Sequence, residues 1–113
     1  MKRKIGDYIE DVIEAMNNAI KFVEDISYNK FIRDIKTTYA AIRAIEIIGE
    51  AVKNIPQEIR QKYTDIPWRD MAGMRDKVIH AYFGVRIERI WEFIKKICQF
   101  LSPGLKILKE LKE

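Results

Sequence analysis

The only histidine of this chain lies in a short segment that also holds an arginine, an aspartate and a tyrosine. Residues 74–82 read Met-Arg-Asp-Lys-Val-Ile-His-Ala-Tyr. On a helix, Arg75 and Tyr82 lie two turns apart and within about 20° of each other around the axis. Asp76 and His80 form an i, i+4 pair on the adjoining strip. The spacing therefore predicts one polar side on an otherwise apolar helix.

These side-chain types suit acid–base chemistry at a phosphate group. Histidine is the only side chain whose unperturbed pKa lies near neutrality, so His80 can take or give a proton. A guanidinium matches two phosphate oxygens at once, so Arg75 can hold a phosphate and stabilise the charge that develops on it. Asp76 can orient the imidazole or hold Arg75.

The same residues also allow a purely structural interpretation. His80 would then be a hydrogen-bonded histidine at the edge of the core and Tyr82 a core residue. Arg75 would form a surface ion pair with Asp76 or Glu50. The residues alone leave both interpretations open.

Size and composition limit what kind of protein this is. The chain has 113 residues and a formal net charge of +4, with a pI near 9.2, so it is mildly basic and tolerates a polyanionic partner. We expect one domain over residues 1–113. A domain of this length buries only about two-thirds of its unfolded surface, so we expect stability to be shared with a second copy or partner.

The sequence lacks the catalytic motifs of most enzyme classes. There is no Ser/His/Asp or Cys/His signature and no glycine-rich phosphate loop. The single cysteine, Cys98, cannot form an internal disulfide, and with one histidine it leaves a Cys/His zinc cluster without ligands. Neither a targeting signal nor a membrane span is expected, and one unpaired cysteine favours a reducing cytoplasm.

Apolar residues recurring at spacings of three and four predict an antiparallel bundle of four to five helices. The expected helices cover residues 5–23, 31–52, a third segment ending at Gly84, about 85–101, and a short C-terminal piece, with one or two further turns at 57–63. The expected starts are Ser27 or Asn29 as a cap, Thr64 or Asp65 as a cap with Pro67 in the first turn, and Ser102-Pro103. Asn54 and Pro56 end the second helix.

The segment around the histidine resembles the HepT-like proteins, a branch of the HEPN superfamily. That family's motif is Arg, four residues, His, any residue, Tyr, and it is present here at residues 75–82 without a departure. Asp76 stands where HEPN sites often carry a polar residue. Other landmarks resemble the family's in the same order: Phe31 with Asp34, residues 47–51 (Ile-Ile-Gly-Glu-Ala), residues 66–68 (Ile-Pro-Trp) and residues 73–75 (Gly-Met-Arg).

This resemblance implies the toxin of a two-gene toxin–antitoxin pair. HepT-like proteins are similar to metal-independent ribonucleases, so neither a metal nor another cofactor is implied. The implied partner is an MntA-type nucleotidyltransferase, which silences the toxin by attaching AMP groups to Tyr82. The resemblance also implies a homodimer in which two motif helices meet at a two-fold axis and share a cleft.

The chemistry of the residues agrees with that role. RNA can be cut without metal because its own 2′-hydroxyl can attack the adjacent phosphate. One histidine per chain cannot easily be both acid and base in one step, whereas two chains supply two. Gly73, which has no side chain, would allow the two motif helices to approach closely. The basic residues near the motif can follow a phosphate backbone; they are Arg69, Lys77, Arg86 and Arg89.

Two alternatives from other classes stay open. The first is a non-catalytic nucleotide- or partner-binding helical subunit of a nucleotidyltransferase complex, in which Arg75 and His80 only hold a phosphate. The second is a purely structural dimerising bundle. Binding and cutting call on the same residues, so the sequence does not separate the first alternative from the ribonuclease.

Overall fold

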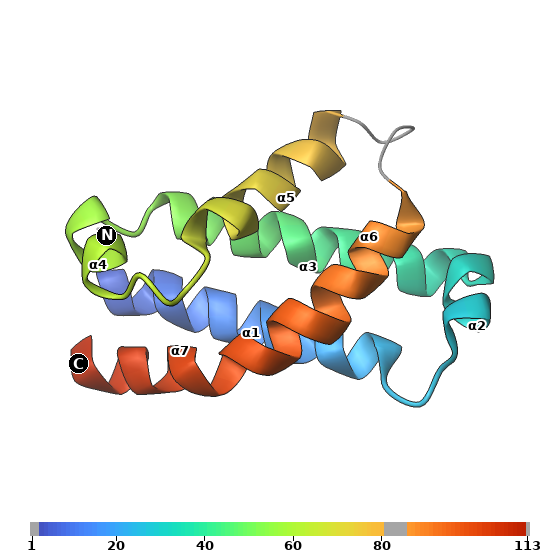
Figure 1. Ribbon diagram of the computed structural model, residues 1–113, viewed down its shortest axis with the longest axis horizontal. Helices are drawn as coiled ribbons and strands as arrows, with labels where there is room; N and C mark the ends of the chain where they lie inside the picture. Colours follow the sequence, from blue (N-terminus) through green and yellow to red (C-terminus); the bar gives the residue numbers. More distant parts are fainter. Residues whose placement is uncertain (1–2, 81–85, 113) are drawn as a thin grey trace.

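Two long amphipathic helices form the base of the molecule. The computed structural model describes residues 3–80 and 86–112, except for the side chains of Ile79, His80, Leu111 and Lys112. Helices α1 (Ile5–Val23) and α3 (Ile35–Lys53) lie side by side along its length (Figure 1). The residues that share their interior faces are fully buried, among them Ile9, Val12, Met16, Ala41, Ile45, Ile48 and Val52. All regular structure in the described ranges is helical, which confirms the predicted all-α class.

A capping aspartate divides what the sequence analysis took as one second helix. Ser27 caps a short helix, α2 (Tyr28–Arg33), and its hydroxyl oxygen accepts the N–H of Lys30. The chain then turns at Asp34, whose carboxylate accepts both the N–H and the hydroxyl of Thr37 at the start of α3. These bonds lower the pKa of Asp34. The prediction of one continuous helix over residues 31–52 was therefore wrong at its first turn.

The segment that carries the motif follows a short connection. Helix α3 ends at the predicted cap, Asn54, and α4 (Gln57–Lys62) supplies the expected extra turns. Helix α5 (Trp68–His80) begins after Pro67, whose carbonyl accepts the N–H of Met71, so neither Thr64 nor Asp65 caps it. Pro67 was predicted in the first turn of this helix, but it immediately precedes the first helical residue, and its carbonyl accepts the helix's first hydrogen bond.

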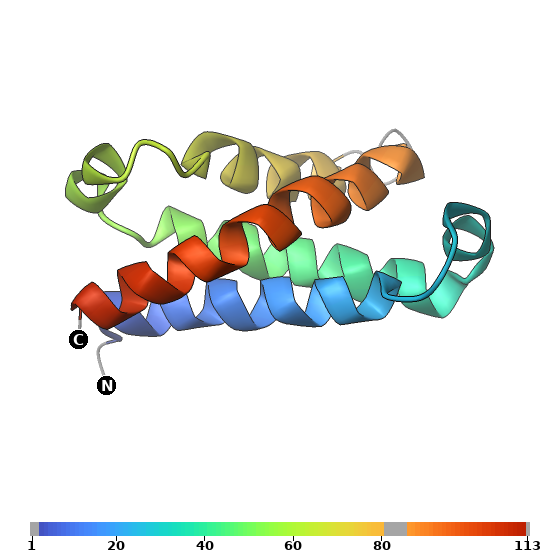
Figure 2. The ribbon, with the colours of Figure 1, turned by 60° about the horizontal axis from the view of Figure 1, so that its bottom comes forward.

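The C-terminal third forms one continuous helical segment. Helix α6 (Ile87–Glu92), the π-helical stretch η1 (Phe93–Cys98) and α7 (Gln99–Lys112) cross the bundle without a break (Figure 2). The predicted new start at Ser102-Pro103 was wrong. The Ser102 hydroxyl instead donates to the Asn17 side chain of α1 at 2.8 Å, and the leucines around it are buried. This packing outweighs the bond that Pro103 cannot make.

The core lies between α1, α3 and the C-terminal segment, with α5 laid over α3 (Figures 1 and 2). Cys98 is buried there, and burial raises the pKa of its thiol to about 12. None of the helices in residues 3–80 and 86–112 is both long and apolar enough to cross a bilayer.

Candidate functional site

A glycine on α3 makes room for the motif arginine on α5. Gly49 is buried, and a Cβ placed on it would overlap the Cβ of Arg75 and lie 2.8 Å from its Cγ. Only a residue without a side chain allows this approach. The stem of Arg75 is thereby held against α3, and its side chain is 26% exposed.

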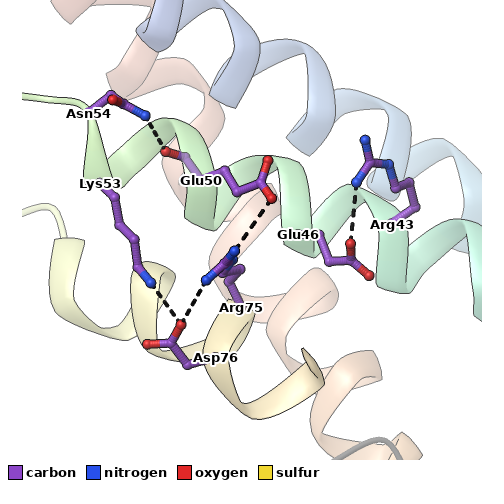
Figure 3. Close-up of polar contacts among 7 residues, drawn as sticks. All are labelled: Arg43, Glu46, Glu50, Lys53, Asn54, Arg75 and Asp76. Atoms are coloured by element: carbon purple, nitrogen blue, oxygen red, sulfur yellow. Dashed lines mark hydrogen bonds and ion pairs between the residues drawn. The ribbon is translucent and has the colours of Figure 1, made fainter. Parts of the chain in front are cut away.

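Two carboxylates hold the Arg75 guanidinium (Figure 3). Its Nη1 donates to Asp76 Oδ1 at 3.2 Å, and its Nη2 lies 3.5 Å from Glu50 Oε1. Its buried Nε has no hydrogen-bond partner among the described residues. The structural interpretation of the sequence predicted an ion pair with Asp76 or Glu50, and both pairs are present.

Lys53 extends this cluster from the last turn of α3. Its Nζ donates to Asp76 Oδ1 at 2.7 Å, so one carboxylate oxygen receives both cations. The hydrogen bond from Lys53 and the smaller contribution of Arg75 hold the pKa of Asp76 below its ordinary value. Asp76 thus holds Arg75, one of its two predicted roles. We call Glu50, Lys53, Arg75 and Asp76 the Arg75 network.

The sequence analysis named three members of this network and missed Lys53. The available signal was its position three residues after Glu50, which places both on the same face of α3. Arg43 and Glu46, also drawn in Figure 3, form a separate ion pair earlier on α3.

Of the other two motif residues, the structure describes the backbone of His80 but not Tyr82. His80 is the last residue of α5, and its side chain is outside the description. At about 100° per residue, its Cα lies roughly 140° around the helix axis from that of Arg75, so the prediction that both stand on one polar side of the helix was wrong. Tyr82 falls outside the described residues, as does the predicted helix end at Gly84.

A basic groove runs along α5 beside α6 and η1. Its volume is about 480 Å³, and four cationic side chains line it: Arg69, Lys77, Arg89 and Lys96. Two carboxylates, Asp70 and Glu92, also border it, and Met74, Phe93 and Ile97 form its apolar part. The structure therefore gathers three of the four basic residues picked out from the sequence. The fourth, Arg86, pairs with Glu88 instead, and Lys96 was missed.

An apolar patch lies where α2, α3 and α6 meet the C-terminal half of α5. Ile35 is 69% exposed and Tyr39 56% exposed, and Ile32 and Ile87 are also exposed. With the buried Val78 of α5 they border a groove of about 240 Å³. Monomeric proteins rarely leave such apolar side chains contiguous and exposed, so this patch is suited to contact with another chain.

The structure is an all-helical bundle in which one helix carries an arginine held against α3 and, on another side, borders a basic groove. The family model described as "Ribonuclease HepT-like" matches residues 12–108. The chain belongs to the HepT-like family.

Relatives at high identity support this assignment. A Thermococcus cleftensis protein named "Probable ribonuclease HepT" is 50% identical over 97% of this chain and 100% of its own length. A Methanocaldococcus jannaschii protein named "Putative RNase MJ0125" is 45% identical over 99% of this chain and 97% of its own. One from Caldanaerobacter subterraneus subsp. tengcongensis, "Putative RNase TTE0752", is 48% identical over 88% of each chain. No solved structure is significantly similar.

Proposed function

We propose that this protein is a metal-independent ribonuclease and the toxin of a two-gene toxin–antitoxin pair. Membership of a ribonuclease family supports the first part. The observation that carries it is the placement of Arg75. Its stem packs directly against α3 at Gly49, where no side chain intervenes, and its guanidinium reaches the surface. Fixed donors favour a transition state because they need no reorganisation as charge develops.

The Arg75 network leaves the guanidinium able to take a phosphate. The pair with Glu50 is long, at 3.5 Å, and the Glu50 side chain is 51% exposed. Such half-exposed pairs are weak, so a phosphate with two oxygens can displace Glu50 from Nη2. Asp76, which also accepts a hydrogen bond from Lys53, keeps Nη1 of Arg75 in place while this exchange occurs.

The reaction is a transesterification within the RNA. The 2′-oxygen forms a bond to the adjacent phosphorus and loses its proton to a base. The bond from phosphorus to the 5′-oxygen breaks, and that oxygen gains a proton from an acid. His80 supplies the proton-transfer group, and Arg75 stabilises the pentacoordinate phosphorane. The products carry a cyclic 2′,3′-phosphate and a 5′-hydroxyl.

A homodimer brings Arg75 of one chain to His80 of the other. Arg75 points at α3, whereas the Cα of His80 lies roughly 140° further around α5, so one chain does not present both residues on one face. The apolar patch of Ile32, Ile35, Tyr39 and Ile87 borders the same end of α5 and suits a second copy. The two motif helices then meet near a two-fold axis and share one cleft.

The basic groove is the path for the RNA strand on either side of the cut. Four cationic side chains line this groove: Arg69, Lys77, Arg89 and Lys96. Cations spaced in this way neutralise successive phosphates. The apolar residues Met74 and Ile97 offer a surface on which a base can lie. Binding is therefore expected to weaken with added salt.

The ribonuclease proposal is tested by incubating single-stranded RNA with the protein in excess EDTA. Cleavage is expected, with cyclic 2′,3′-phosphate ends, and it is expected to vanish in Arg75→Ala and His80→Ala while the helical circular dichroism is retained. Retention of RNA without cutting would favour a nucleotide- or partner-binding subunit instead. Ends that carry a 5′-phosphate, or activity that is lost in EDTA, would contradict the metal-free mechanism.

Control by a cognate MntA-type nucleotidyltransferase is proposed to act through Tyr82. On a continuing helix Tyr82 shares a side with Arg75, so an attached AMP would place a phosphate beside the guanidinium and fill the cleft. Co-expression with a neighbouring nucleotidyltransferase is expected to add AMP-sized masses to the wild type and none to Tyr82→Phe, which stays toxic. Equal neutralisation of both proteins would instead show that control is simple binding.

A further inference from the structure

Helix α7 turns a second apolar face away from the bundle. Phe100 is 82% exposed and Ile107 60% exposed, and the two lie seven positions apart on one side of the helix. Pro103 and Gly104 stand between them and are exposed, and a Cβ placed on Gly104 would have no atom within 4 Å. In Figure 2 no other described element lies in front of this helix.

We propose that this face binds the same face of a second copy, with the two α7 helices antiparallel and a two-fold axis passing between Pro103 and Gly104. Under that symmetry, Phe100 lies at the level of Ile107 of the partner subunit, and the reverse pair forms on the other side of the axis. The glycines near the axis let the helices approach closely. A single stripe thus supplies both halves of the contact.

The charges at the edges of the stripe are complementary in the same register. Lys96 and Glu110 are both exposed. Their positions are nearly equidistant from the axis, so Lys96 lies within about one residue's rise of Glu110 of the partner subunit. Both fall on the same side of the contact, and the symmetry repeats the opposite-charge pair. This self-complementarity under a two-fold axis is expected of a contact between copies and not of a contact with an unrelated protein.

This surface is separate from the apolar patch beside α5. Figure 1 places α7 toward one end of the long axis and α2, which carries Ile32, at the other. Two different two-fold contacts on one chain build assemblies of more than two copies. The α7 contact does not depend on the ribonuclease proposal or on the dimer through the motif helix.

Solution mass separates the two contacts. Light scattering of the wild type is expected to give more than two copies of 13.4 kDa. Phe100→Asp is expected to leave two, because a charge is placed against the Ile107 side chain of the partner subunit. Ile35→Asp is the matched variant in the other patch, and the double variant is expected to be monomeric. A wild type of two copies that Phe100→Asp alone makes monomeric would keep the α7 contact and remove the other one. An unchanged mass in Phe100→Asp overturns the proposal.

A charge swap tests whether the occupant is a copy of this chain. Lys96→Glu and Glu110→Lys are each expected to lower the mass, and the double variant is expected to restore it because the pair re-forms with reversed signs. Failure of the double variant to recover would contradict the proposed register.

Cross-linking tests the axis itself. Gly104→Cys is expected to form a disulfide with its own copy under mild oxidation, since position 104 lies beside the axis, whereas Lys30→Cys on the exposed surface of α2 is not. The native Cys98 does not interfere because it is buried. Equal cross-linking of the two variants, seen on a non-reducing gel, would overturn the arrangement.

Discussion

Helix α3 makes two contacts of opposite character. Against α1 it presents a fully buried aliphatic face that includes Ile45, Ile48 and Val52. Against α5 it presents Gly49 and the charged Glu50 and Lys53, which pair with Arg75 and Asp76. The first contact carries stability. The second keeps a charged side chain half-buried with an unpartnered Nε, which a purely structural interface would avoid.

The difference shows which contacts the free energy of unfolding depends on. The α1–α3 contact and the buried leucines of α7 hold the bundle without α5's polar residues. The Arg75 network can therefore be arranged for binding. Substitutions in the two contacts should separate activity from stability.

The largest effect is expected at Arg75. Arg75→Ala should lower RNA cleavage by about 100-fold or more, the range seen when one transition-state donor is lost. Its free energy of unfolding should change little, because the two ion pairs that it loses are half-exposed. Arg75→Lys keeps the charge but loses the paired donors, so it should restore only part of the rate. A destabilised and fully active Arg75→Ala would make this contact structural.

The opposite result is expected at Ile48. Its side chain is fully buried, so Ile48→Ala should lower the free energy of unfolding by about 2–5 kcal/mol. Cleavage per folded molecule should be unchanged, measured at a temperature where circular dichroism shows full folding. A selective loss of cleavage would mean that the two contacts are coupled.

Gly49 tests the contact from the α3 side. Gly49→Ala forces its Cβ into the stem of Arg75 and should cost about 1–3 kcal/mol as well as activity. Gly73→Ala on α5 is the matched control, since no atom lies within 4 Å of its added Cβ, and it should stabilise the chain by about 0.5–1 kcal/mol. Thermal unfolding would distinguish the two variants, measured at concentrations where both form assemblies of the same mass. Equal destabilisation would contradict the close approach at Gly49.

The smallest effect is a titration. Hydrogen bonding to Lys53 lowers the pKa of Asp76, so this carboxylate stabilises the folded state above its unfolded pKa. That stabilisation is lost as the pH falls through the lowered value. In Lys53→Met, carbon NMR should show the Asp76 pKa moving up toward its ordinary value, and the acid midpoint of unfolding should rise slightly. An unmoved pKa would mean that Lys53 does not hold Asp76 in solution.

The fold was largely predictable because apolar spacing records which face is buried. The bounds of α1 and the end of α3 follow from that pattern and from Asn54 and Pro56. The errors arose where local signals compete. Asp34 ends one helix and caps the next, and Ser102 resembles a cap while its hydroxyl bonds to a residue 85 positions away.

The site was predictable to the extent that it is local in sequence. Arg75 and Asp76 are neighbours, and the family motif identifies them. Lys53 was missed because it reaches Asp76 only through the packing of α3 against α5, and Lys96 because it lies in a groove that η1 and α5 border together. No helical spacing within α5 contains that information.

The central claim is that Arg75 and His80 of different chains form one site, and mixing two inactive variants tests it most directly. Arg75→Ala and His80→Ala are unfolded together at equal amounts and refolded. If the site is shared, half of the dimers are mixed and each regains one intact site, so cleavage should return to about a quarter of the wild-type rate. A mixture as inactive as its two components would contradict the shared site.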